Sequence, residues 1–209
     1  MDTPEQIIKT IASPINHQLK IVLKGDKKLL NTKNTNYSYG TLVKVLEYGL
    51  DNIPMTDISS VLLLGMGGGS IIYSLRKKYQ CLAPVTAIEI DPIVIDIASD
   101  KFNVKENDTL KIHCIDAWEY IKKSTEKFDL IIIDIFIDTE VPEKFYQAAF
   151  WQDLEKNVED NGFILFNAGI DLKEEEVSKF VSQLPQSFIY QKNHGVLESN
   201  TVIIIQKIF

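Results

Sequence analysis

Short apolar runs rich in β-branched residues recur along most of the chain. They comprise residues 61–64, 85–90, 110–114, 130–133 and 163–166. Runs of this kind are typical of strands that are covered on both faces. Segments with helical spacing alternate with them, at residues 70–79, 92–101, 116–123, 143–157 and 173–183. This alternation predicts an α/β fold with a parallel, doubly wound sheet and right-handed crossovers.

The end of the chain departs from this alternation. Two further apolar segments, residues 187–192 and 200–208, are separated only by NHGVLES. Since a helical crossover does not fit into so short a link, these segments predict two consecutive antiparallel strands that close the sheet.

The chain before residue 51 follows a different pattern. Residues 5–12 predict a short helix. Residues 18–24 and 27–31 flank the pair Gly-Asp and predict a β-hairpin, because these two residue types tolerate the left-handed geometry of a tight turn. Helical spacing then runs from Tyr39 to about Leu50. We therefore expect an N-terminal segment at residues 1–50 and a main domain at residues 51–209.

Composition narrows the classes of function. With 209 residues, 45% of them hydrophobic, the chain can bury one substantial core. A net charge of -7 and a pI near 5.0 argue against a broad basic surface for nucleic acid. Cys81 and Cys114 are too far apart for a CxxC metal site and too few for a disulfide scaffold. No segment has the roughly 20 apolar residues of a membrane span, so we expect a cytoplasmic protein that binds neither membranes nor nucleic acid.

The first predicted strand of the sheet runs into the segment GMGGGS, after which helical spacing resumes at once. Its glycines are Gly65, Gly67, Gly68 and Gly69. They remove side chains where the backbone turns sharply and a ligand approaches, and Ser70 is placed to cap the following helix. Ligands of open α/β sheets bind at the carboxyl ends of the strands, so this loop is the predicted ligand site.

A glycine loop alone does not distinguish nicotinamide dinucleotides from S-adenosylmethionine. The dinucleotide pattern GxGxxG would place a third glycine where Ser70 stands, which disfavours that class. Glu89 ends the second predicted strand about 20 positions after Gly69, where a carboxylate accepts hydrogen bonds from ribose hydroxyls in either class.

Two further carboxylates end predicted strands. Asp116 follows the third strand, where it can accept a hydrogen bond from an adenine amine, cap the next helix, or do both. Asp134 ends the fourth strand, after an almost wholly apolar run. At the mouth of the sheet it would face the reacting end of a ligand, where it can hold a substrate amine or accept its proton.

This series of motifs resembles the spermidine synthase branch of the class I S-adenosylmethionine-dependent methyltransferases. VLLLGMGGGS is similar to the first motif of that branch, EIDPIVIDIA to the second and IHCIDAWEYI to the third. FDLIIIDIFIDTEVPEKFYQAAFWQDLEKNVEDNGFILFN resembles the fourth and fifth, and LKIVLKGDKKLLNTKNTNYSYGTL resembles the upstream hairpin and tyrosine-bearing segment. The resemblance covers about residues 18–205. It implies a Rossmann-like sheet of seven strands in the order 3-2-1-4-5-7-6, with strand 7 antiparallel and a short N-terminal hairpin extension.

The chain also departs from this branch. Spermidine synthases place an Asp in the glycine loop, which holds the amine of decarboxylated S-adenosylmethionine, and Gly68 stands at that position here. Their tyrosine is followed by Gln-Glu, whereas Tyr39 is followed by Gly-Thr. Their catalytic loop resembles DSSDPxGP, but this chain has DIFIDTEVP, with Asp138 one position late. An Asp in the loop would repel the carboxylate of S-adenosylmethionine, so its replacement by glycine favours that cofactor over the decarboxylated form.

The resemblance assigns roles to the residues of these motifs. The residues expected to bind the cofactor are Gly65, Gly67, Gly68, Gly69, Glu89, Asp116, Ala117 and Asp134. The residues expected to act on the acceptor are Asp134, Tyr39 and Asp138. No metal site is expected, and the resemblance implies a homodimer.

Four functions remain open at this stage. The leading hypothesis is a methyltransferase that uses S-adenosylmethionine and acts on a small molecule, an amine among the candidates, or on a peptide nucleophile. The first alternative is aminopropyl transfer from decarboxylated S-adenosylmethionine to a polyamine. The second is a non-catalytic nucleoside-binding or interaction module, and NAD-dependent redox chemistry ranks last.

Overall fold

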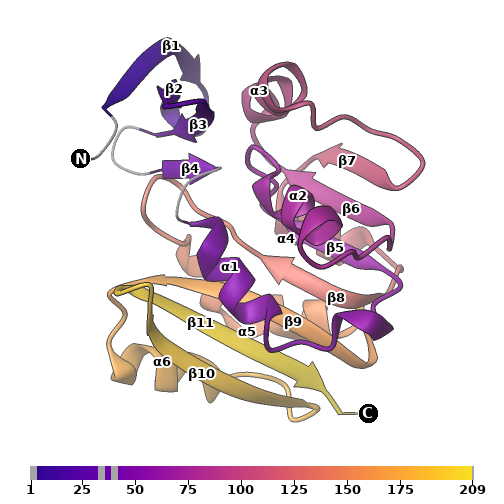
Figure 1. Ribbon diagram of the computed structural model, residues 1–209. Helices are drawn as coiled ribbons and strands as arrows, with labels where there is room; N and C mark the ends of the chain where they lie inside the picture. The colour runs from indigo at the N-terminus through magenta and orange to yellow at the C-terminus, as the bar shows by residue number, and fades with distance from the viewer. Residues whose placement is uncertain (1–3, 33–35, 39–41, 209) are drawn as a thin grey trace.

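The computed structural model describes residues 4–32, 36–38 and 42–208. These residues form two sheets, a four-stranded one near the N-terminus and a seven-stranded one that carries the main core (Figure 1). No helix in the described ranges is long and apolar enough to cross a membrane.

The large sheet has the predicted topology. Its strands are β5 (Val61–Leu64), β6 (Val85–Glu89), β7 (Leu110–Cys114), β8 (Phe128–Ile133), β9 (Val158–Ile170), β10 (Phe188–Val196) and β11 (Asn200–Lys207). They lie in the order β10-β11-β9-β8-β5-β6-β7. Strands β5 to β9 pair in parallel, whereas β11 is antiparallel to both of its neighbours. The predicted order and the antiparallel seventh strand are confirmed.

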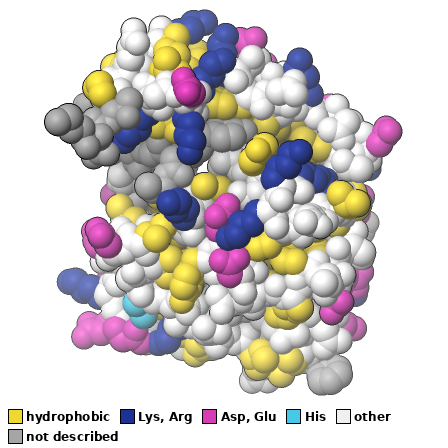
Figure 2. All heavy atoms as spheres, in the orientation of Figure 1, with side chains coloured by type: hydrophobic (Ala, Val, Ile, Leu, Met, Phe, Trp, Pro, Cys, Tyr) yellow, Lys and Arg dark blue, Asp and Glu magenta, His cyan; other side chains and the backbone are white. Residues whose placement is uncertain are grey.

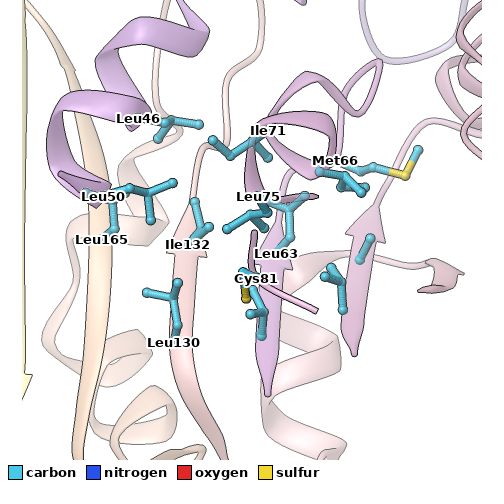
Figure 3. Close-up of a cluster of buried hydrophobic side chains, with 14 of the residues drawn as sticks. Leu46, Leu50, Leu63, Met66, Ile71, Leu75, Cys81, Leu130, Ile132 and Leu165 are labelled. Atoms are coloured by element: carbon cyan, nitrogen blue, oxygen red, sulfur yellow. The ribbon is translucent and has the colours of Figure 1, made fainter. Parts of the chain in front are cut away.

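Helices cover both faces of this sheet. They are α1 (Val43–Leu50), α2 (Ser70–Lys77), α3 (Pro92–Phe102), α4 (Ala117–Lys123), α5 (Ala148–Glu155) and α6 (Glu174–Val181), with short 3₁₀ turns η1 (Met55–Asp57) and η2 (Glu143–Tyr146). One core cluster joins Leu63 to Leu46 of α1 and Leu75 of α2 (Figure 3). Leu62 and Leu64, which flank Leu63 in β5, belong to the core cluster on the other face of the sheet, together with residues of α4, α5 and α6. The continuous apolar run of β5 is thus explained, since alternate side chains enter opposite layers.

The single helix predicted for residues 143–157 is interrupted. Gln147 has extended backbone angles, φ -78° and ψ 140°, and separates η2 from α5. The predicted helix that starts at Tyr39 begins at Val43, and residues 39–41 lie outside the described part.

The N-terminal sheet contains β1 (Glu5–Ser13), β2 (His17–Lys24), β3 (Lys27–Asn31) and β4 (Asn36–Ser38) in that order. The hairpin of β2 and β3 is confirmed, but the short helix predicted for residues 5–12 is wrong, because this segment is strand β1. Its isoleucines and threonine favour extended backbone, and a helix of one or two turns is unstable without packing. Pairing with β2 therefore decides its conformation.

The N-terminal sheet packs on α3. Leu19, Ile21 and Leu30 form a small core with Val94 and Ile97 of that helix. On the face shown in Figure 2, lysine and arginine side chains lie over the upper part of the molecule, where this sheet lies, with acidic side chains among them. The contact with α3 places the turn between β1 and β2 beside the carboxyl end of β6.

Candidate functional site

The glycine loop is anchored to the neighbouring strands by its backbone. The N–H groups of Gly65 and Met66 both donate to the carbonyl of Ile88, at 3.0 Å each. Gly65 has φ +88°, and a Cβ there would lie 2.2 Å from the carbonyl oxygen of Asp134. Only glycine fits at this point, since the end of β8 passes directly over it.

The start of α2 differs from the prediction. Gly69, in the left-handed conformation with φ 82°, is the residue that precedes the helix, and Ser70 is its first helical residue. Ser70 is therefore not the N-cap. A Cβ on Gly69 would lie 2.6 Å from Cγ2 of Val104, so close packing as well as φ requires glycine here.

Glu89 holds the loop from the end of β6. One carboxylate oxygen accepts from the N–H of Gly67 at 2.9 Å, and the other accepts from the N–H of Asp91 at 3.0 Å. The side chain is 3% exposed, and burial raises its pKa to about 7 in spite of these two donors. A carboxylate offers about four lone-pair positions, so these donors do not use all of them.

Asp91 connects this arrangement to the N-terminal sheet, and its role was not predicted from the sequence. It is fully buried, caps α3 through the N–H of Ile93 at 3.0 Å, and accepts a hydrogen bond from Nδ2 of Asn16 at 3.0 Å. The hydroxyl of Ser13 also donates to it. The pair Asp91-Pro92 carries the usual signal of a helix start, which could have revealed the cap but not the two distant donors.

Asp116 is the N-cap of α4, which confirms the capping role predicted for it. Its Oδ1 accepts from the N–H groups of Trp118 and Glu119, at 2.9 and 3.2 Å. Lys144 forms an ion pair with Oδ2. Burial opposes ionisation of this carboxyl, but the hydrogen bond from Lys144 and the two amides outweigh burial and lower the pKa. Lys144 was not predicted, because nothing in the local sequence links it to a residue 28 positions away.

Asp134 lies between the glycine loop and β9. Its N–H donates to the carbonyl of Leu64 at 2.9 Å, and its Oδ1 accepts from Nδ2 of Asn167 at 2.9 Å. Burial raises the pKa of Asp134 to about 6, and the hydrogen bond from Asn167 opposes that rise. Asn167, 1% exposed, was also missed, although one polar residue at the end of the apolar run FILFN was a usable signal.

A cavity of about 120 Å³ brings five predicted residues together. These residues are Gly65, Glu89, Asp116, Ala117 and Asp134. Most of the remaining wall is apolar and includes Ile90, Phe136 and Phe145. Small-molecule sites usually measure roughly 300–1,000 Å³, so binding of a whole nucleoside requires side chains of this wall to move.

The other predicted residues do not line this cavity or lie outside the described part. Gly67, Gly68 and Gly69 continue the loop beside it. Asp138 has φ 55° and accepts a hydrogen bond of 2.6 Å from the hydroxyl of Thr32, the residue that follows β3. Tyr39 falls outside the described residues. In the described ranges, no group of three His, Cys, Asp or Glu side chains is arranged to hold a metal ion.

Comparison of the sequence with known proteins gives one family and distant relatives. The model of the spermine/spermidine synthase domain matches residues 48–202. A polyamine aminopropyltransferase of Vibrio vulnificus is 29% identical over 110 residues, which are 51% of this chain and 36% of that protein. The eEF1A lysine and N-terminal methyltransferase of Xenopus laevis is 29% identical over 119 residues, 52% of this chain and 17% of that protein. The chain thus spans well under half the length of these two relatives.

Solved structures share the fold at low identity. A probable spermidine synthase from Corynebacterium glutamicum superposes with a TM-score of 0.80 at 14% identity, and covers 97% of this chain and 80% of its own. Human methyltransferase-like protein 13, in complex with SAH, superposes with a TM-score of 0.64 at 19% identity, and covers 81% of this chain and 83% of its own. The same fold therefore occurs in a protein named as a spermidine synthase and in a protein named as methyltransferase-like.

Proposed function

Because the chain belongs to the spermine/spermidine synthase domain family, we propose that it binds S-adenosylmethionine and transfers its methyl group to a small or peptide nucleophile. The glycine loop would lie against the methionine part of the cofactor, Glu89 would accept the ribose hydroxyls, and Asp116 with Ala117 would contact adenine. The methyltransferase names among its relatives and structural neighbours support this assignment.

The observation that carries the proposal is Gly68. Spermidine synthases are expected to have an Asp at this position, and the three acids that line the cavity, Glu89, Asp116 and Asp134, all come from other strand ends. The N–H of Gly68 has no acceptor among the described residues. An N–H group of this kind, in a loop that has no acid, can donate a hydrogen bond to the carboxylate of S-adenosylmethionine. The decarboxylated form lacks this carboxylate.

Asp134 would act on the acceptor. Its raised pKa of about 6 lets it accept a proton near neutral pH. The sulfonium of S-adenosylmethionine would supply the methyl group to the lone pair of an amine nitrogen, and the electron pair of the broken bond from carbon to sulfur would remain on sulfur. Asp134 would accept the proton that the amine loses. Alignment and removal of this proton supply what such a displacement needs.

Isothermal titration calorimetry with both cofactor forms tests the proposal. The wild type is expected to bind S-adenosylmethionine more tightly than its decarboxylated form. Gly68 has no positive φ, unlike Gly65, Gly67 and Gly69, so its φ does not oppose the substitution Gly68→Asp, which is expected to reverse the preference. A wild type that prefers the decarboxylated ligand would contradict the proposal.

Aminopropyl transfer is the second candidate, and it is favoured by the predominance of polyamine aminopropyltransferase names among the relatives. The same cavity would serve, with Asp134 binding the attacking amine. Asp138, which was predicted to bind the attacking amine together with Asp134, is hydrogen-bonded to Thr32 and does not line the cavity. This arrangement supports methyl transfer as the first choice.

A further inference from the structure

Lys144 is the one basic side chain among the described residues that line the cavity of about 120 Å³ at the glycine loop. It comes from η2, the short turn that the break at Gln147 separates from α5. Its ammonium group is held at two sides, by the ion pair with Asp116 and by the ring of Phe145, whose centroid lies 5.0 Å from Nζ. The ammonium therefore lies beside the carboxylate of Asp116 in the cavity wall, although the Lys144 side chain is 37% exposed.

Asp116 can bind one further donor without losing Lys144. A carboxylate has about four lone-pair positions. The N–H groups of Trp118 and Glu119 use two of them and Lys144 uses a third. An incoming donor at the last position would sit next to the ammonium of Lys144, because both would bond to the same carboxylate.

Adenine carries a matching pair of groups on one edge. Its exocyclic amine is a donor, and the adjacent ring nitrogen N7 is an acceptor. An asparagine side chain recognises this edge with one acceptor and one donor side by side. Asp116 and Lys144 present the same two functions from two elements, α4 and η2.

We propose that Lys144 recognises the cofactor by donating a hydrogen bond to N7 of adenine while Asp116 accepts from the amine, an inference that rests on the proposed function. Lys144 is then a specificity residue for the nucleoside. In a base with a carbonyl oxygen in place of the amine, this oxygen would lie opposite the carboxylate of Asp116. Two acceptors repel each other, so such a base would bind more weakly.

The test compares two ligands that differ only at N7. Dissociation constants are measured by calorimetry for S-adenosylhomocysteine and for its 7-deaza analogue, in which a C–H replaces N7. The wild type is expected to bind the 7-deaza analogue about tenfold more weakly, because a hydrogen bond from a charged donor is lost. In Lys144→Met both ligands are expected to bind with similar affinity, and Lys144→Gln, with a neutral donor, is expected to give an intermediate ratio.

Lys156→Met is the matched control, since Lys156 is paired with Asp153 on the surface with its side chain 74% exposed. It should keep the wild-type ratio. If Lys144→Met weakens both ligands equally and leaves the ratio unchanged, Lys144 only supports the fold and the inference is overturned while the proposed function stands. If the wild type binds neither ligand, the proposed function and the inference both fail.

Discussion

The amide of Asn167 donates a hydrogen bond of 2.9 Å to the carboxylate of Asp134. Asp134 directly follows β8 and Asn167 lies within the adjacent parallel strand β9, each one residue beyond the paired Ile133 and Phe166, so the sheet itself sets their separation. The Oδ1 atom of Asn167 is buried and has no partner among the described residues. An unpaired buried acceptor is costly, which indicates that the donor side of this amide sets its orientation.

Replacing Asn167 is expected to raise the pKa of Asp134 above its present value of about 6. Asn167→Leu keeps a similar volume but removes a donor to the charged form, so ionisation becomes harder, by about one pKa unit. NMR titration of the Asp134 carboxyl carbon measures this shift directly. Asn200→Leu, at another buried asparagine with an unpaired Oδ1, is the control that should leave this titration unchanged. If Asp134 titrates in Asn167→Leu as it does in the wild type, Asn167 does not influence the pKa of Asp134.

Gly65 offers a test of how closely the glycine loop approaches β8. Gly65→Ala is expected to lower the free energy of unfolding by about 3–5 kcal/mol, because the new Cβ meets a backbone oxygen at 2.2 Å in addition to the strain of φ +88°. Gly195→Ala is the control, with φ +65° and no atom within 4 Å of the added Cβ. In Gly195→Ala, backbone strain alone should lower the free energy of unfolding by about 1 kcal/mol. Equal losses in urea denaturation would show that the contact with Asp134 is unimportant.

Glu89 makes stability depend on pH. Its folded pKa of about 7 exceeds the ordinary 4.5, so the folded protein favours the protonated carboxyl. The stability that this group contributes is present below pH 4.5 and is lost as pH rises through 7, by at most about 3 kcal/mol.

Glu89→Gln is therefore expected to flatten the fall in the free energy of unfolding between pH 5 and pH 8, since glutamine does not ionise. Denaturant unfolding at these two values of pH measures the difference. Asp134, whose pKa is also raised, is present in both proteins and cancels in the comparison. Glu175→Gln on the exposed side of α6 should keep the wild-type slope. The same slope in Glu89→Gln would assign the pH dependence to other groups.

Sequence by itself determined the large sheet and the edge of it where the predicted ligand-binding residues lie. The apolar run of β5 is buried on both faces and the glycines follow it directly, so periodicity and residue type sufficed to place Gly65, Glu89, Asp116 and Asp134 at strand ends. These signals are local, and in a parallel sheet all carboxyl ends lie on one edge. The strand order followed from the resemblance and the short final link, and the structure has the same order.

Tertiary structure alone decided the rest. The segment 5–12 carries apolar residues that suit either a short helix or a strand, and only pairing with β2 made it a strand. Asp134 and Asp138 follow the same strand, yet only the first lines the cavity, whereas the second accepts a hydrogen bond from Thr32, the residue after β3. Lys144 meets Asp116 across 28 positions, at the place where η2 turns towards the cavity. Periodicity reports which face of an element is buried, whereas contacts between side chains depend on how separate elements pack, and no local pattern encodes that.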